Sequence, residues 1–305
     1  MSENPLHIAR RDGRSGSHRH GRLVFSVLAL AAGLVLLAAA PARGRWEVVH
    51  TTEPSDMGHA SASAETAVIP TDTPVPLPDR ARVPILMYHY VSDLPAGADR
   101  YRRDLTVSPE NFQAQLQYLT DAGYHPITLT DIYYHFTQGI PLPEKPVVLT
   151  FDDGYRDAYD VVFPILLDYG YPGTFFVLAS PAHYESADYL TWGQVKEMSD
   201  AGMAIEGHGR DHVDLRGRSY DYLVYQTLGI QEAIHHHTGR LPRFFCYPAG
   251  QYDASVIAVL ESEGYWGAVT TQYGREHTPG NLYEMRRVRV RGSDTLASFV
   301  DKLGD

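Results

Sequence analysis

Hydrophobic and polar positions follow two alternating patterns from residue 83 to the end of the chain. Short runs of aliphatic and β-branched residues predict buried strands, and stretches with apolar residues three or four positions apart predict amphipathic helices between them. The predicted strands are 84–88, 125–129, 147–151, 173–178, 203–206, 244–247, 267–270 and 288–290. The predicted helices are 109–122, 131–136, 157–167, 192–199, 220–237, 254–263 and one that begins at 295.

This succession of about eight strand–helix units predicts an α/β fold with a parallel sheet closed into a barrel. An open, doubly wound sheet fits less well, because no glycine-rich dinucleotide loop follows the first strand. All strands of a parallel barrel end at the same face, so residues directly after them are expected to converge. These residues are His89, Asp152, Asp153, Gly207, His208, Tyr247 and Pro248.

The first 82 residues differ in composition. Residues 1–22 carry five arginines against two acidic residues and predict a basic cytoplasmic tail. Residues 23–40 contain no charge and are long enough for a hydrophobic helix across a bilayer, with the arginines on the inner side. The segment 23–42 is either a transmembrane anchor or a signal peptide cut near Ala42. Residues 43–82 predict a disordered linker, so the domain at 83–305 is expected outside the cytoplasm, anchored or secreted.

Charge and cysteine content limit the chemistry. The formal net charge is −11 with dispersed acidic residues, which gives no indication of nucleic-acid binding. Cys246 is the one cysteine, so neither an intrachain disulfide nor a cysteine-based zinc site can form. Any metal ion must therefore bind to His, Asp or Glu side chains.

Two acidic residues, Asp152 and Asp153, end the predicted strand 147–151. Adjacent carboxylates repel each other, so they persist most easily when one binds a cation or holds a proton. The alternative is that they only bind free N–H groups at the start of a helix. After the strand 203–206 come His208 and His212, and two imidazoles with one carboxylate leave a coordination position open, as in a catalytic zinc site.

The motifs together resemble those of the polysaccharide deacetylases, also called the NodB-homology group or carbohydrate esterase family 4. The three leading motifs are TFDDG at 150–154, the histidine pair within 207–212, and FCYPAG at 245–250. The stretches VPILMYHYV, LTVSPENFQAQLQYLTDAGYHPITL and MRRVRV resemble the branch that contains poly-N-acetylglucosamine deacetylases. The resemblance extends from residue 83 to the C-terminus.

This resemblance implies a deformed (β/α) barrel and a role for each matching residue. Asp153, His208 and His212 match the ligands of a divalent metal, most often Zn²⁺, with Co²⁺ or Ni²⁺ as other options. Asp152 matches the base that takes a proton from a metal-bound water. His89 matches the general acid of the poly-N-acetylglucosamine branch, since the late Leu-x-His motif of other members is missing. The alternatives are a structural role for His89 and an acid role for His277, which is less suited because its sequence suggests a mobile loop.

The chain also departs from the family pattern. Cys246 stands where many members have an arginine that pairs with the base, so Arg287 or Arg289 is expected to take its place, or the base is unpaired. Ala249 replaces a common aromatic residue, and its backbone N–H is the expected oxyanion donor. Tyr247, Ala249 and Arg287 are candidate oxyanion or substrate contacts. Arg210 and Asp211 lie between the two histidines, where small or hydroxyl residues are common.

Other polar and aromatic residues are expected to have structural roles. Asp157 and Asp160 predict a solvated helix face. The histidines 235–237 predict the last turn of a helix, closed by Gly239. The tyrosines are expected mainly to pack, and one or two of them, with Trp192, to stack on sugar rings. These tyrosines include Tyr155, Tyr171, Tyr252 and Tyr273.

The sequence therefore predicts an exported, metal-dependent hydrolase that removes N-acetyl groups from an N-acetylglucosamine-containing polysaccharide. One alternative is an O-acetyl esterase that acts on xylan or peptidoglycan with the same metal site. Another is a carbohydrate-binding domain without catalysis. Besides the polysaccharide, the membrane is an expected partner through residues 23–40 if this segment is not cleaved. The polymer, the metal and the oligomeric state are left open by the sequence.

Overall fold

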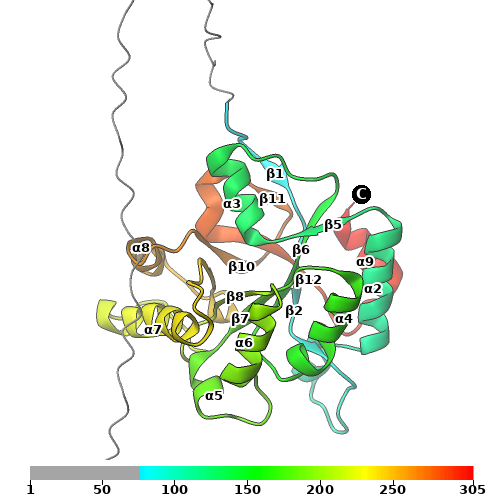
Figure 1. Ribbon diagram of the computed structural model, residues 1–305, viewed down its shortest axis with the longest axis horizontal. Helices are drawn as coiled ribbons and strands as arrows, with labels where there is room; N and C mark the ends of the chain where they lie inside the picture. Colours follow the sequence, from blue (N-terminus) through cyan, green and yellow to red (C-terminus); the bar gives the residue numbers. More distant parts are fainter. Residues whose placement is uncertain (1–75, 305) are drawn as a thin grey trace, which may run out of the picture. The chain divides into compact units, whose positions relative to one another are not determined.

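A ring of parallel strands forms the centre of the folded domain (Figure 1). The computed structural model describes residues 76–304. Within this part, seven strands close into a barrel, because β2 pairs with both β12 and β6. Their order around the ring is β2 (Ile85–Tyr88), β12 (Met285–Arg289), β10 (Gly267–Tyr273), β9 (Phe244–Cys246), β8 (Ala204–Gly207), β7 (Thr174–Val177) and β6 (Pro146–Phe151). The strand β5 (His125–Ile127) pairs with β6 outside the ring, and the predicted parallel barrel is confirmed.

Helices follow most strands, as the apolar periodicity predicts. The helices around the ring are α2 (Pro109–Asp121), α4 (Phe163–Tyr169), α6 (Trp192–Asp200), α7 (Tyr220–Thr238), α8 (Ala254–Ser262) and α9 (Leu296–Leu303). The predicted helix 157–167 is interrupted, because a π-helical turn at Ala158–Val162 precedes α4. Pro164, in the first turn of α4, has no N–H to give to a regular helical hydrogen bond with residue 160.

Several short elements have no periodic sequence pattern and were not predicted. These are β1 (Ala81–Arg82), β3 (Tyr90–Val91), α1 (Arg100–Leu105), β4 (Thr106–Val107), α5 (Ala179–His183) and β11 (Glu276–His277). The prediction of a linker up to residue 82 is wrong at its end, because β1 pairs with β11. The predicted segments 1–22 and 23–42 lie outside the described residues. None of the helices within 76–304 combines the length and the apolar character needed to cross a membrane.

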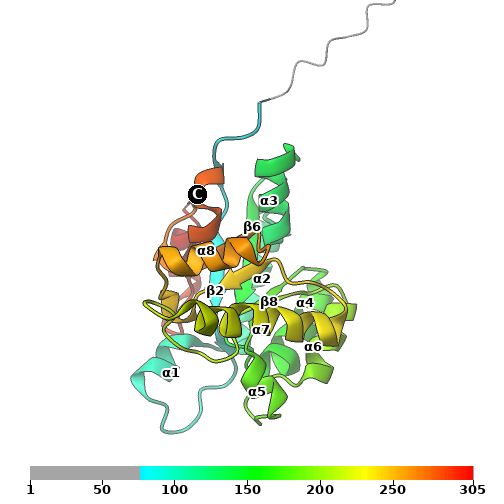
Figure 2. The ribbon, with the colours of Figure 1, turned by 90° about the vertical axis from the view of Figure 1, so that its left-hand side faces the viewer.

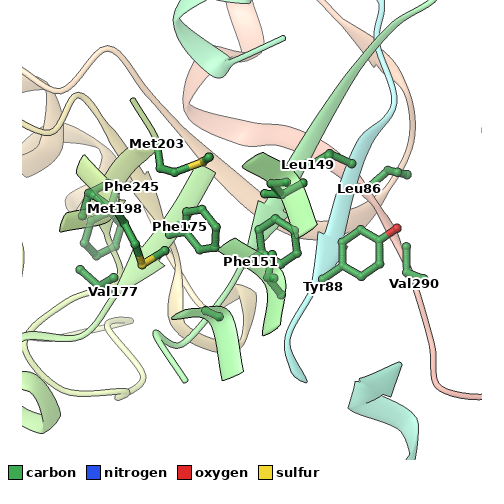
Figure 3. Packing of buried hydrophobic residues seen from close by; sticks show 14 of the residues in the cluster. Leu86, Tyr88, Leu149, Phe151, Phe175, Val177, Met198, Met203, Phe245 and Val290 are labelled. Atoms are coloured by element: carbon green, nitrogen blue, oxygen red, sulfur yellow. The ribbon is translucent and has the colours of Figure 1, made fainter. Parts of the chain in front are cut away.

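The strands separate an inner core from an outer core. The inner core contains one or two residues from most strands of the ring: Ile85, Val148, Phe176, Phe244, Val269 and Met285. Helix α3 (Leu129–Gln138) adds Leu129, Ile132 and Phe136 to this core. Neighbouring residues on the same strands point outward and pack against the helices. Figure 3 shows Phe175 and Phe151 of this outer core between Val177 and Tyr88.

Strand alternation directs three polar side chains to the inside of the barrel. Residues two apart on a strand share a face. Asp152 therefore continues the inward side of β6, Arg287 that of β12, and Cys246 that of β9. Figure 2 shows α3 at one end of the barrel and α1 and α5 at the other. The end with α1 and α5 is where the strands finish, and the polar side chains lie there.

The side chain of Glu206 supplies hydrogen bonds between β8 and β9, where the strand pairing of the ring is shortest. The pairing of β8 with β9 is limited to Gly207 and Phe245. Below this point, one carboxylate oxygen of Glu206 accepts hydrogen bonds from the backbone N–H groups of Arg243 and Phe244, each at 2.7 Å. Burial raises the pKa of Glu206 to about 8 and outweighs these two bonds.

We expect Glu206→Ala to lower the free energy of unfolding by about 2 kcal/mol, because it leaves the buried N–H of Phe244 and the partly buried N–H of Arg243 without an acceptor. Glu206→Gln keeps an oxygen acceptor at the same place and is expected to cost no more than about 1 kcal/mol. Urea denaturation followed by circular dichroism measures both variants. Equal stabilities for the two variants would show that the carboxylate does not hold β8 and β9 together.

Candidate active site

A tight turn after β6 positions the two adjacent acidic residues. Asp153 has φ 71° and Gly154 has φ 69°, both in the left-handed region. This conformation is costly for a residue other than glycine and is found mainly at turns and functional sites. At Gly154 a Cβ atom would lie 3.3 Å from the Cα of Val177, so the turn also needs glycine for space. The turn separates the directions of the two carboxylates.

Asp153, His208 and His212 come together as predicted. Oδ1 of Asp153 lies 3.0 Å from Nε2 of His208 and 3.5 Å from Nε2 of His212. One ligand atom from each of the three residues lies within 4.8 Å of the others. Asp153 and His208 are buried, whereas the side chain of His212 is 44% exposed. Such a set of two nitrogens and one oxygen, open on one side, fits a divalent cation.

The backbone of the third motif fixes the orientation of His208. Nδ1 of His208 lies 2.7 Å from the carbonyl oxygen of Cys246. A carbonyl can only accept, so Nδ1 carries a proton, and Nε2 is the ring atom that faces Asp153 and can act as a metal ligand. Burial opposes ionisation of Asp153, but its hydrogen bond to His208 and the nearby imidazoles lower its pKa. The carboxylate is therefore ionised and available as a ligand.

Asp152 forms a buried, bidentate ion pair with Arg287. Nη1 and Nη2 of Arg287 each donate to one oxygen of Asp152 at 2.7 Å. The guanidinium also donates from Nε to the carbonyl of Thr270 at 2.9 Å and from Nη1 to the hydroxyl of Thr150 at 3.1 Å. Burial raises the pKa of Asp152, but the charge and hydrogen bonds of Arg287 outweigh it and lower the pKa overall.

This ion pair shows that Arg287, and not Arg289, is the partner of Asp152. Arg289 lies 3.0 Å from Asp104 instead, and its pairing with the base is not observed. The side chain of Arg287 is fully buried, so its candidate role as a substrate contact is replaced by its contact with Asp152. The thiol of Cys246 lies 3.2 Å from Nη2 of Arg287 and 3.5 Å from Asp152. A small residue at this position leaves space for the guanidinium from β12.

His89 lies on the other side of Asp152. Its Nε2 is 3.9 Å from Oδ2 of Asp152, and the side chain is 14% exposed. Its Nδ1 is shielded from solvent and has no hydrogen-bond partner among the described residues. Burial lowers the pKa of His89, and the charges of Asp152 and Asp153 act in the opposite direction. The position thus brings an imidazole next to the base.

His277 is far from this group. The prediction of a mobile loop is wrong, because His277 is buried in β11 and its Nε2 bonds to the carbonyl of Val83 at 2.9 Å. Val83 precedes β2, whereas His89 follows it. The six residues from 83 to 89 span about 20 Å of extended chain. His277 therefore cannot act at the same place as His89.

In the third motif the hydroxyl of Tyr247 has a structural contact, whereas the N–H of Ala249 is not used by its own turn. Tyr247 is buried, and its hydroxyl donates to the carbonyl of Tyr283 at 3.0 Å, so its side chain has a structural contact. Ala249 is exposed and has φ 52°. The hydrogen bonds of this turn come from the N–H groups of Gly250 and Gln251. The turn itself therefore does not use the N–H of Ala249.

Among the residues with a predicted structural role, Asp157 has a different environment from the one predicted. Asp157 is not on a solvated helix face, because Oδ2 accepts the N–H of Val91 at 3.0 Å and burial raises its pKa to about 6. Asp160 is exposed, as predicted. The histidines 235–237 end α7 at Gly239, and His237 stacks on Trp192 at 4.5 Å.

The fold and these residues define a class of protein: a barrel hydrolase with an Asp-His-His cluster and a second carboxylate beside it at the strand ends. Residues 139–268 match the family model described as polysaccharide deacetylase. YxkH of Bacillus subtilis (strain 168), which is named for polysaccharide deacetylase, is 31% identical over 219 residues, or 72% of this chain and 75% of YxkH. The chain belongs to the polysaccharide deacetylase family, whose members are hydrolases of amide bonds.

Two further matches extend the comparison. The poly-β-1,6-N-acetyl-D-glucosamine N-deacetylase of Escherichia coli (strain K12) is 27% identical over 259 residues, which cover 72% of this chain but 38% of that protein. The structure of the Streptococcus pyogenes deacetylase PplD in complex with acetate has a TM-score of 0.68 and 28% identity. It covers 74% of this chain and 99% of that structure.

We expect Arg287→Met to lower the free energy of unfolding by about 3 kcal/mol, because it leaves the charge of Asp152 buried without a partner. In an Asp152→Asn background the same substitution is expected to cost less, since the uncompensated charge is gone. Urea denaturation of the four proteins gives the coupling energy. Additive costs would show that the two side chains do not depend on each other.

Proposed function

We propose that this protein removes N-acetyl groups from an N-acetylglucosamine-containing polysaccharide with the help of a divalent cation. The observation that carries the proposal is the position of Asp152, which Arg287 holds beside His89, directly before Asp153 of the Asp153–His208–His212 cluster. The similarity to the Escherichia coli enzyme named for poly-β-1,6-N-acetyl-D-glucosamine supports this substrate class. Because the chain spans 38% of that protein, the comparison supports the reaction more than the polymer length or linkage.

Asp153, His208 and His212 are the residues that would hold the cation. Two imidazoles and a carboxylate favour Zn²⁺, and Co²⁺ or Ni²⁺ suit the same donors. A divalent cation at such a site lowers the pKa of water from about 15.7 to about 7 and polarises a carbonyl. This chemistry suits a base such as Asp152, whose pKa is lowered and which on its own is too weak to deprotonate free water.

Asp152 acts as the base and takes a proton from the attacking water. Its bidentate contact with Arg287 restricts rotation of the carboxylate, so the oxygen near His89 keeps its direction. The N–H of Ala249 is the proposed donor to the oxygen that becomes negative as the acetamide carbonyl is attacked. The proton taken up by Asp152 passes to His89, whose Nε2 lies 3.9 Å away, and His89 gives it to the amine as the C–N bond breaks, so the products are acetate and a free amino group.

The proposed location of the catalytic domain outside the cytoplasm is inferred from the N-terminal sequence. Residues 23–42 form the proposed membrane anchor or signal peptide, and they lie outside the described residues. With either reading, residues 83–305 act outside the cytoplasm on an extracellular polysaccharide. Whether the domain is attached to the membrane or secreted depends on cleavage near Ala42.

We expect Asp152→Asn to reduce acetate release from N-acetylglucosamine oligomers by at least about 10³-fold, because the amide cannot take the proton. The bound zinc per protein, measured by atomic absorption, is expected to stay unchanged, since Asp152 is not a ligand. Asp168→Asn on the exposed part of α4 is the matched control and keeps full activity. Retained turnover by Asp152→Asn would refute its role as base.

We expect His89→Gln to lower kcat for N-acetylated oligomers by about 10²- to 10⁴-fold, as for loss of a general acid. For 4-nitrophenyl acetate the loss is expected to be much smaller, because nitrophenolate leaves without a proton. Both rates are measured on the zinc-loaded enzyme, with His183→Gln on the surface as the control. Equal losses for both substrates would assign His89 to positioning rather than to proton donation.

A further inference from the structure

The two histidines of the Asp153–His208–His212 cluster are held in different ways. His208 is buried directly after β8, and its Nδ1 bonds to the carbonyl of Cys246 at 2.7 Å. His212 lies further along the loop that follows β8, and 44% of its side chain is exposed. Within residues 76–304, no carbonyl of another residue holds the ring of His212, and its polar contact is with Asp153 at 3.5 Å. The place of His212 therefore depends on the backbone of its loop.

A fully buried glutamine of α7, Gln226, binds this loop. Its Oε1 accepts the backbone N–H groups of Arg210 and Asp211, each at 3.0 Å. Backbone N–H groups can only donate, so these contacts fix the orientation of the amide. Nε2 is therefore directed to the side chain of Asp211 and donates to its Oδ2 at 3.0 Å. Three hydrogen bonds thus join one side chain to the two residues directly before His212.

The beginning of α5 holds the first part of the same loop. The N–H of Ala179 donates to the carbonyl of Gly209 at 3.2 Å, and the N–H of Ser180 donates to the carbonyl of Arg210 at 2.8 Å. Gly209 has φ 89°, and a Cβ there would lie 3.3 Å from Oε1 of Gln226. The loop and the amide are thus in close contact. Loss of the amide is expected to leave the first part of the loop in place and to loosen the part that leads to the second histidine.

A neutral amide suits this place better than a carboxylate. It combines an acceptor for two N–H groups with a donor for the carboxylate of Asp211. A glutamate at the same position would bring a second negative charge against Asp211 in a buried place. The hydrogen bonds of Gln226 within the described part of the chain go to Arg210, Asp211 and Tyr222, so the amide acts on the loop and not on the ligand atoms.

We infer that Gln226 is a positioning residue of the metal site, which sets the place of His212 relative to Asp153 and His208 and thereby the affinity for a divalent cation. The inference rests on the proposed function, because it concerns the same cation. Groups that orient a metal ligand from behind contribute about 10- to 100-fold to metal affinity. His208 has such a group in the carbonyl of Cys246, and Gln226 has the corresponding task for His212 through the loop backbone.

The test compares two buried glutamines of the same helix. Gln231 is also buried in α7, but its Nε2 donates to the carbonyl of Pro242 at 3.3 Å. In the full-length protein we expect Gln226→Met to raise the dissociation constant for Zn²⁺ about 30-fold, measured by competition with a chromophoric chelator. Gln231→Met is the matched control, because it removes a buried amide from the same helix. It is expected to lower the stability in urea and to leave the constant for Zn²⁺ unchanged.

A milder variant keeps the test valid if Gln226→Met does not fold. The amide of Gln226→Asn is one carbon shorter and cannot reach both N–H groups of the loop. We expect this variant to raise the dissociation constant for Zn²⁺ at least about tenfold. Circular dichroism shows whether each variant is folded before its metal affinity is measured.

A double-mutant cycle shows whether Gln226 acts through His212. In a His212→Ala background, Gln226→Met is expected to cause no further rise in the dissociation constant for Zn²⁺, because the ligand that it positions is absent. The absorption spectrum of the Co²⁺-loaded protein gives a second readout. Gln226→Met is expected to shift the d–d bands toward those of His212→Ala, whereas Gln231→Met keeps the spectrum of the unmodified protein.

The outcomes separate this inference from the proposed function. An unchanged constant for Zn²⁺ in folded Gln226→Met or Gln226→Asn overturns the inference even if acetate is released. An equal loss in Gln231→Met, or a full additional loss in the His212→Ala background, overturns it as well. Zinc binding that depends on Gln226, without acetate release from any N-acetylglucosamine oligomer, overturns the proposed reaction and leaves the positioning role intact. Failure of the unmodified protein to bind zinc overturns both.

Discussion

The ion pair between Asp152 and Arg287 is the contact on which the site depends. It joins the end of β6 to β12 across β2, the strand between them in the ring. Two charges inside a barrel are costly to desolvate, and the cost is offset only when the remaining donors also have partners. Here the carbonyl of Thr270 and the hydroxyl of Thr150 provide them. The pair therefore fixes the mouth of the barrel in one arrangement.

That arrangement also explains how two adjacent carboxylates can coexist. Asp152 continues the inward side of its strand and meets a guanidinium. Asp153 enters the left-handed conformation and faces His208 and His212 instead. Each carboxylate thus has its own positive or potentially positive partner, and their mutual repulsion is reduced. The division gives the two residues different chemistry, because one is held as an oriented acceptor and the other is left as a ligand.

Much of this could be predicted from the sequence, because the strands have local apolar runs and the site residues directly follow them. The expectation that Asp153 and the two histidines approach each other at the strand ends needed no tertiary information, whereas the position of β5 outside the ring did not follow from the sequence. The choice between Arg287 and Arg289 needed tertiary information, because residues two apart on a strand face the same side and only their depth in the barrel differs. The burial of Asp157 depends on the chain around Val91 and Arg102, far away in sequence. Two-residue strands such as β1 and β3 are too short to have a period.

The exposure of the site residues indicates the side from which a substrate approaches. Asp152, Asp153 and His208 are buried, and Arg287 and Cys246 close the site from inside the barrel. Access is left beside His212, Ala249 and His89, which come from three different loops. His208 is held by a backbone carbonyl, so the buried part of the cluster is the more rigid one. A long polymer can lie across such an opening without entering the barrel.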